Sequence, residues 1–189
     1  MMRAALVAAA LAAPSLAFGQ TPINGRARLD LVGVAPSACL ISTPTAASGS
    51  NATFAAAGAQ QGEINITQMA DPRTAVAVAA TINLALPVIC NTAHQVVIST
   101  ANGGLTRLGA VAGGPEVNGF RQFVPYQLSA NWAGQSASAA SRAGPAITIR
   151  SADGAAGQLS LVISVPGGGA PLVAGAYGDQ VVIQLQVAS

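Results

Sequence analysis

The side chains that could perform chemistry are few in this chain and are scattered along it. There is one histidine, His94, and there are two cysteines, Cys39 and Cys90. A Gly-x-Ser-x-Gly sequence, which would mark a nucleophilic serine, does not occur. No spacing among the acids identifies a glycosidase pair; the acids are Asp30, Glu63, Asp71, Glu116, Asp153 and Asp179. The sequence therefore predicts no catalytic residues, no metal site and no cofactor, and we do not expect an enzyme.

Three features that look like functional motifs are expected to be structural. The glycines at 167–169 follow a predicted strand but lack the lysine and the helix of a phosphate-binding loop. His94 has no second histidine or clustered carboxylate near it in the sequence, so we expect it at a turn or a strand edge. Trp132 is expected in the core or at its rim rather than as a sugar-binding platform.

The first nineteen residues have the pattern of a secretory signal peptide. Arg3 precedes an apolar run over 4–13, and small residues follow at 15–19. The run is shorter than the roughly 20 residues of a membrane-spanning helix, and no later stretch reaches that length. We expect cleavage after Gly19 or after Ala17, export through the periplasm, and a final location at the cell surface or in an extracellular fibre.

Export determines how the two cysteines are interpreted. An exported chain folds in an oxidising compartment, so Cys39 and Cys90 are expected to form a disulfide. A metal site would need more ligands than the single histidine adds. Closing a loop of about fifty residues stabilises a fold by roughly 4 kcal/mol in the chain-entropy treatment.

Charge is scarce, at 7% of the residues, and all eight basic residues are arginines. Loss of Arg3 with the signal peptide leaves seven arginines against six acids, a net charge of +1. These arginines are spread from Arg26 to Arg150, so no basic patch is predicted and nucleic acid is not an expected partner. A weakly charged surface of small residues suits a protein that packs against copies of itself.

Apolar residues alternate with a period of two from residue 20 onward, and glycine, proline, asparagine and aspartate separate the alternating runs. This pattern predicts strands over 23–31, 63–67, 81–90, 95–100, 123–130, 146–150, 159–165 and 179–187. Two segments rich in alanine, serine and glycine, 43–62 and 133–144, are interpreted as loops. A helix over 70–80 stays open as an alternative. Many short strands with frequent turns predict a single all-β sandwich.

Four places in the chain resemble the spore coat protein U domain, the domain of archaic chaperone–usher pilins. The first is the short alternating strand 25–31, followed by Cys39. The second is the strand at 86–91, which ends near Cys90. The third is a strand, a glycine-rich turn and a strand containing Tyr126. The fourth is a closing Gly-x-Tyr-x-Asp sequence before the last strand, formed by Gly175, Tyr177 and Asp179.

The resemblance implies an immunoglobulin-like sandwich that is incomplete and is filled by donor-strand exchange. The donor would be the N-terminal segment 20–34, ahead of a domain over 35–189. Its inward-facing residues would be Ile23, Gly25, Ala27, Leu29 and Leu31. The implied protein is a structural subunit of a surface pilus or coat-like fibre, with a role in adhesion or biofilm. Its partners would be copies of itself or related pilins, a periplasmic chaperone and an outer-membrane usher.

The pattern of residues leaves other structures and functions open. The alternation at 23–31 also fits a first strand of the domain's own sheet. In the corner before the last strand, Tyr177 is expected to fill space and Asp179 to cap the turn. One alternative function is a monomeric secreted or periplasmic binding module with a complete sandwich. Another is a hydrolase on a sandwich scaffold, which would require His94 near two acids in a cleft.

Overall fold

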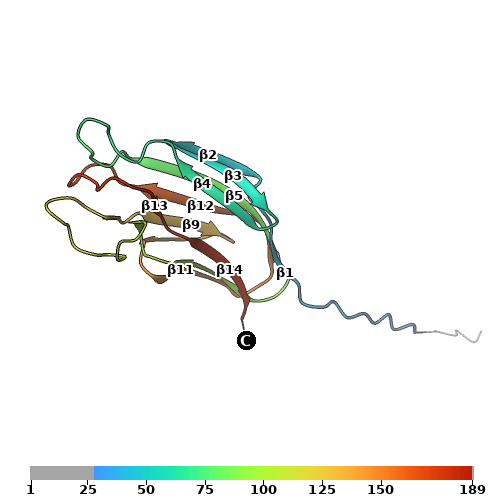
Figure 1. Ribbon diagram of the computed structural model, residues 1–189. Helices are drawn as coiled ribbons and strands as arrows, with labels where there is room; N and C mark the ends of the chain where they lie inside the picture. The colour runs from blue at the N-terminus through green and yellow to red at the C-terminus, as the bar shows by residue number, and fades with distance from the viewer. Residues whose placement is uncertain (1–27, 189) are drawn as a thin grey trace, which may run out of the picture. The chain divides into compact units, whose positions relative to one another are not determined.

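The computed structural model describes residues 28–188, and Figure 1 shows its strands in chain order. Residues from Pro36 onward form one compact unit, and residues before it belong to a separate N-terminal unit. The described part of the chain is all-β, as the alternation predicts, and its sheets do not close into a barrel. It contains no helix of the length and apolar character needed to cross a membrane.

The largest sheet has six antiparallel strands in the order β1-β5-β12-β9-β10, with β2 also paired to β5. Its longest pair, β5 with β12, is in register from Ala80↔Val165 to Cys90↔Ala155. Alternate residues of both strands are buried, which is the pattern of strands with one face on a core. The bounds are β1 (Cys39–Ile41), β2 (Ala46–Ser50), β5 (Ala80–Cys90), β9 (Gln127–Trp132), β10 (Gln135–Ala140) and β12 (Ala155–Val165).

A second sheet of three strands lies below the larger one in Figure 1. β6 (His94–Thr100) is its central strand, between β11 (Gly144–Ser151) and β14 (Val181–Val187). Val96 and Ile98 of β6 are completely buried, and they belong to one apolar cluster with the inward residues of the larger sheet. Burying a residue of this size contributes about 1.5–3 kcal/mol, so this shared core accounts for the layered arrangement.

Two smaller sheets complete the fold. One joins β7 (Leu105–Arg107), β8 (Phe123–Val124) and β13 (Tyr177–Gly178). The other is the hairpin of β3 (Ala52–Gly58) and β4 (Gln61–Ile66), whose strands pair only with each other. Asn51 shapes the base of this hairpin in a left-handed conformation, with φ of 57°. Asparagine tolerates this backbone conformation better than most residues. Its side chain also bonds to Gln68 and to the carbonyl of Ala79.

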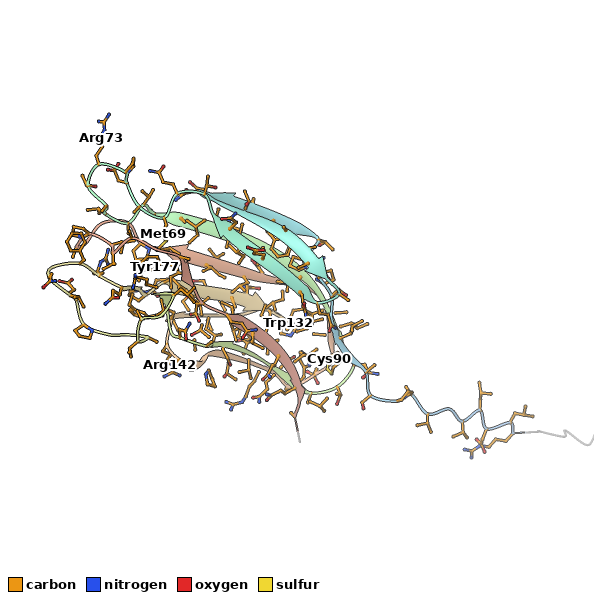
Figure 2. All side chains as sticks on the ribbon, in the orientation of Figure 1. Met69, Arg73, Cys90, Trp132, Arg142 and Tyr177 are labelled. Carbon is orange, nitrogen blue, oxygen red and sulfur yellow. A yellow bond between two sulfur atoms is a disulfide. The ribbon has the colours of Figure 1, made fainter. Side chains whose placement is uncertain are left out.

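The predicted disulfide is confirmed. Cys39 and Cys90 are bonded to each other across 51 residues of sequence. They are directly opposite in the ladder between β1 and β5, so the bond fixes the short strand β1 to the edge of the larger sheet. Figure 2 labels Cys90 at the end of the unit opposite to Tyr177.

His94 is not at a turn or sheet edge, so that expectation was wrong. It begins the central strand β6 and is 1% exposed. Its Nδ1 donates to the carbonyl of Thr92 at 2.7 Å, and its Nε2 accepts from the Trp132 indole N–H at 2.8 Å. Trp132 is 2% exposed and lies in the core, as expected (Figure 2). The indole N–H and both imidazole nitrogens therefore have hydrogen-bond partners, as buried polar groups require.

The two alanine- and serine-rich segments are strands rather than the predicted loops. Residues 43–62 contain β2, β3 and the start of β4, and residues 133–144 contain β10 and the start of β11. These strands are largely exposed, so small polar residues are tolerated in them. The run 123–130 is split between β8 and β9 at Pro125, and residues 70–80 form no helix.

Candidate functional site

A groove with a mainly apolar lining lies between β14 and the larger sheet. One wall is β14, which contributes Val181, Ile183 and Leu185, all half-buried. The opposite wall and floor come from the larger sheet, and the cavity volume is about 870 Å³. The apolar residues of that wall and floor include Ile41, Ile82, Leu84, Leu86, Leu161 and Ile163. The floor of the groove is therefore formed by side chains of the core itself.

The strand β14 has one paired edge and one free edge. It pairs with β6 from Val181↔Thr100 to Val187↔His94. Within residues 28–188 no strand pairs with its other edge. A free edge presents unpaired backbone N–H and C=O groups to any extended segment that lies alongside it. The groove thus offers both apolar contacts and a hydrogen-bonding template.

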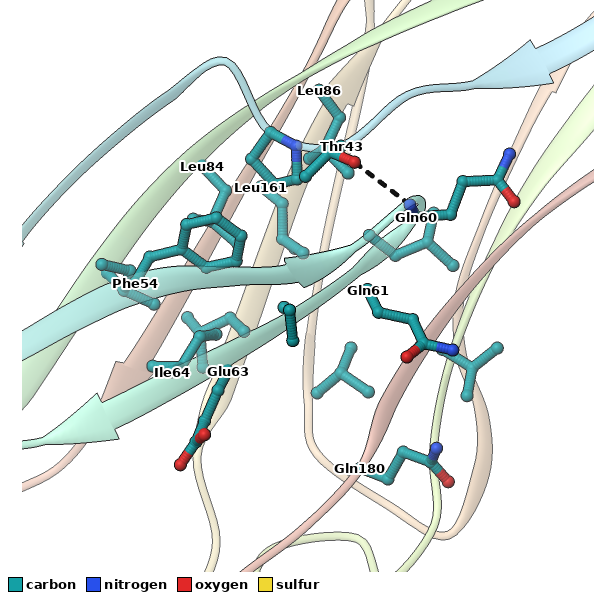
Figure 3. Close-up of a pocket in the computed structure, with 18 of the residues that line it drawn as sticks. Thr43, Phe54, Gln60, Gln61, Glu63, Ile64, Leu84, Leu86, Leu161 and Gln180 are labelled. Carbon is teal, nitrogen blue, oxygen red and sulfur yellow. Dashed lines mark hydrogen bonds between the residues drawn. The ribbon is translucent and has the colours of Figure 1, made fainter.

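The hairpin β3–β4 lies over this groove, as Figure 3 shows. Phe54, Ile64 and Ile66 are half-buried and pack against the core from the hairpin. At the hairpin tip, Gln60 donates its backbone N–H to Thr43 Oγ1 at 3.1 Å and its side-chain N–H to the carbonyl of Ile41 at 2.9 Å. The ladder of the hairpin joins neither of the two main sheets, so the hairpin is held there by its side-chain contacts and by the bonds of Gln60.

The rim of the groove is polar, and its charged residues are acidic. Gln61, Glu63 and Gln180 lie on the side of the hairpin away from the Phe54 ring (Figure 3). The two charged residues among those that line the groove are Glu63 and Asp179. Glu63 is exposed, and it takes part in none of the ion pairs of the described chain. The groove therefore has an apolar interior and a negative edge.

Asp179 has a different environment from Glu63, because its carboxylate already accepts four hydrogen bonds from the protein. Its Oδ1 accepts the backbone N–H groups of Asn102 and Gln180, both at 2.8 Å. Its Oδ2 accepts the backbone N–H of Gly104 and the hydroxyl of Tyr126, both at 2.9 Å. The side chain ties the start of β14 to the turn after β6 and to the residue before β9.

The other residues of the closing Gly-x-Tyr-x-Asp sequence lie in the same corner. The Tyr177 hydroxyl contacts the carbonyls of Val173 and Arg121 at 2.8 and 3.1 Å. Gly175 has φ of 143°, and a Cβ there would come 3.0 Å from Arg107 Nε. Glycine suits both conditions, since it has no Cβ and accepts positive φ. The structure brings Tyr126, Gly175, Tyr177 and Asp179 together at one end of the unit, next to the groove.

Tyr126 makes the stability of the folded protein depend on pH in the alkaline range. Burial, together with the hydrogen bond and negative charge of Asp179, raises the pKa of the Tyr126 hydroxyl well above its usual range. An unfolded tyrosine ionises near pH 10. The folded state then holds a proton that the unfolded state has lost, so stability is full below about pH 10 and decreases above it.

We expect the Tyr126→Phe variant to lose part of this alkaline dependence. Each tyrosine held protonated contributes a slope of about 1.4 kcal/mol per pH unit above pH 10. Burial also raises the pKa of Tyr177, so the variant should keep the part due to that residue. Urea denaturation between pH 8 and 12 measures the slope. An identical slope in the wild type and the variant would contradict this assignment.

The predicted donor segment is only partly within the described residues. Ile23, Gly25 and Ala27 lie outside them, as does the predicted signal peptide at 1–19. Residues 28–35 form no strand, which leaves the role of the alternation a prediction. The exposed fraction of their large apolar side chains is between 86% and 102%, namely for Leu29, Leu31, Val32 and Val34. Such complete exposure of four apolar residues is unfavourable in water.

The residues with potential for catalysis are not brought together. His94 is enclosed by Trp132 and Thr92 rather than by acids. Across residues 28–188, no three side chains of the histidine, cysteine, aspartate or glutamate type gather in a way that could hold a metal ion. The sequence missed Phe54, because it lies in an alanine-rich run that was interpreted as a loop, whereas Ile64 lies in the strand predicted over 63–67. The alternation of Ile64 and Ile66 predicted β4 but gave no sign of the strand that pairs with it.

No known protein family, curated protein or solved structure matches this chain. The site is therefore interpreted from its own geometry.

Proposed function

We propose that this protein is a structural subunit of a surface pilus or coat-like fibre, assembled by donor-strand exchange. In this proposal, the fold is an immunoglobulin-like sandwich that lacks one strand. The observation that carries the proposal is the apolar groove bordered by the free edge of β14. The occupant is the N-terminal segment 20–34 of a neighbouring copy.

The physical basis is the addition of a strand to an open edge. A segment lying beside β14 would pair with its free backbone groups, and its alternate side chains would enter the groove. Leu29 and Leu31 are exposed in the described chain. Burying each of them in the groove would stabilise the complex by about 1.5–3 kcal/mol. The odd-numbered residues Ile23, Gly25, Ala27, Leu29 and Leu31 would form the inward face.

Repetition of this contact would build a filament. The donor segment and the groove are different surfaces of one chain, so each subunit can accept one neighbour and donate to another. An unfilled apolar groove favours unwanted association, which is the reason to propose a periplasmic chaperone and then an outer-membrane usher. The resemblance of the sequence to spore coat protein U domains supports the same assembly, together with export and a role in adhesion or biofilm.

The proposal is tested with a truncated protein that begins at Val32 and a synthetic peptide of residues 20–34. The peptide is expected to raise the melting temperature of the oxidised protein by well over 5 °C, because it fills the groove and pairs with β14. A peptide with Leu29 and Leu31 replaced by aspartate is the matched control and should cause no shift. A stable monomer whose melting is unaffected by the wild-type peptide would contradict donor-strand exchange.

One observation favours a second candidate function, a monomeric secreted or periplasmic binding module. The cavity volume of about 870 Å³ falls within the roughly 300–1,000 Å³ of small-molecule sites. The groove would then hold an apolar ligand rather than a strand. A mature chain that stays monomeric at high concentration and binds an apolar fluorescent probe would favour this function.

A further inference from the structure

We infer that Glu63 selects the donor strand by pairing with its arginine face, so that it sets which side of the strand enters the groove. This inference rests on the proposed donor-strand exchange. It adds a residue that determines specificity, and it defines the partner as an arginine-bearing strand of a second copy. The observation behind it is a polar rim whose charged residues are both acidic, around a groove with an apolar interior.

The charges of the two surfaces are complementary. The segment 20–34 carries Arg26, Arg28 and Asp30, a net charge of +1. The groove is lined by two acids and by no basic residue. The carboxylate of Asp179 already accepts four hydrogen bonds. Glu63 is therefore the acid at the rim whose charge is available to an incoming strand.

The phase of the donor strand explains why such a selection is needed. Leu29 and Leu31 belong to the odd-numbered face, but Val32 and Val34 belong to the even-numbered face. A slip of one residue would turn the valine face inward and drive Arg28 and Asp30 toward the apolar interior. An acid at the rim favours the odd-inward phase, because in that phase the arginines remain at the edge near Glu63.

Arg28 has a weak competing partner in the free segment. Its Nε lies 2.9 Å from Asp30 Oδ1, and both side chains are largely exposed. Such an exposed pair has little stability. An arginine at the partly covered rim of the groove can therefore exchange this contact for Glu63 at small cost. Because Arg26 and Arg28 share one face, either of them can reach the rim carboxylate.

The experiment uses the full mature chain, residues 20–189, and measures head-to-tail oligomers by sedimentation at low and high salt. Glu63→Arg is expected to raise the protein concentration needed for half-assembly about tenfold, and Glu63→Gln about threefold. The double reversal R26E/R28E should weaken assembly as Glu63→Arg does. Combining it with Glu63→Arg should restore assembly toward the wild-type level. High salt should reduce all these differences, since it screens charges at the surface.

Glu116→Arg is the matched control, because it makes the same charge change at another exposed acid. It should leave assembly unchanged, and thermal melting of each monomer should show that the variants remain folded. If oligomers of Glu63→Arg were as stable as those of the wild type, selection by Glu63 would be overturned and donor-strand exchange would still stand. A wild-type chain that forms no oligomers would overturn both proposals.

Discussion

Replacing Asp179 with alanine should lower the free energy of unfolding by about 3–5 kcal/mol. The carboxylate accepts three backbone N–H groups and the Tyr126 hydroxyl. Gly104 and Tyr126 are buried, so water cannot easily replace the lost acceptor. Leaving such donors unsatisfied costs more than the net value of the bonds themselves. Urea denaturation at pH 7 measures the change.

Two further variants separate the contributions at this corner. Asp179→Asn keeps one acceptor oxygen but directs an amide N–H at a neighbouring donor, so it should recover only part of the stability. Tyr126→Phe removes a single bond and should cost about 1–2 kcal/mol. If Asp179→Ala were as stable as Tyr126→Phe, the carboxylate of Asp179 would not be what holds this corner together.

The second large effect is expected from removing the disulfide. The double variant C39A/C90A should lose about 4 kcal/mol, the value for a closed loop of this length in the chain-entropy treatment. Alanine is suitable because Cys90 is 1% exposed and a serine hydroxyl would be buried there. The loss should also loosen β1, whose three residues form part of the groove wall.

Reduction of the wild-type protein provides an independent check. A reductant should lower the denaturation midpoint of the wild type and should leave that of C39A/C90A unchanged. Peptide binding to the groove should weaken in the same variant, because Ile41 follows Cys39 in β1. A double variant with wild-type stability would mean that the bond only links strands that the core already holds.

The strands with large inward residues are the part of the fold that sequence alone could predict. The run 81–90 has Ile, Leu and Val on one face, and β5 spans Ala80–Cys90. β6, β12 and β14 follow their predicted runs in the same way. In each case the period-two pattern reflects burial of one face, which is a property of the side chains themselves.

The strands made of alanine, serine and glycine could not be predicted in this way. β10 has the sequence QSASAA, and its residues are paired from Gln135↔Trp132 to Ala140↔Gln127. Its strand conformation depends on the edge that β9 offers rather than on its own residues. Strand β3 (Ala52–Gly58) was missed for the same reason, whereas β4 (Gln61–Ile66) overlaps the run predicted over 63–67.

In the candidate site, too, some features could be predicted from the sequence and others depend on the fold. The pairing of Cys39 with Cys90 could be predicted, because the cysteine count left one partner for each. Asp179 and Tyr126 were selected as separate parts of a motif, and their hydrogen bond joins residues 53 positions apart. Long-range contacts of this kind depend on the fold. The burial of His94 with Trp132 has the same origin, since nothing in the sequence places one beside the other.

The pairing of β14 with β6 also has a consequence for the order of folding. Val187 lies opposite His94, so the first residue of the central strand of the second sheet meets its partner only after more than ninety further residues along the chain. Proteins with such distant pairings fold slowly, on a scale of milliseconds to seconds, because a long loop must close first. In the export proposed for this chain, Val96 and Ile98 would therefore emerge well before β14, and the proposed chaperone would be needed most during this interval.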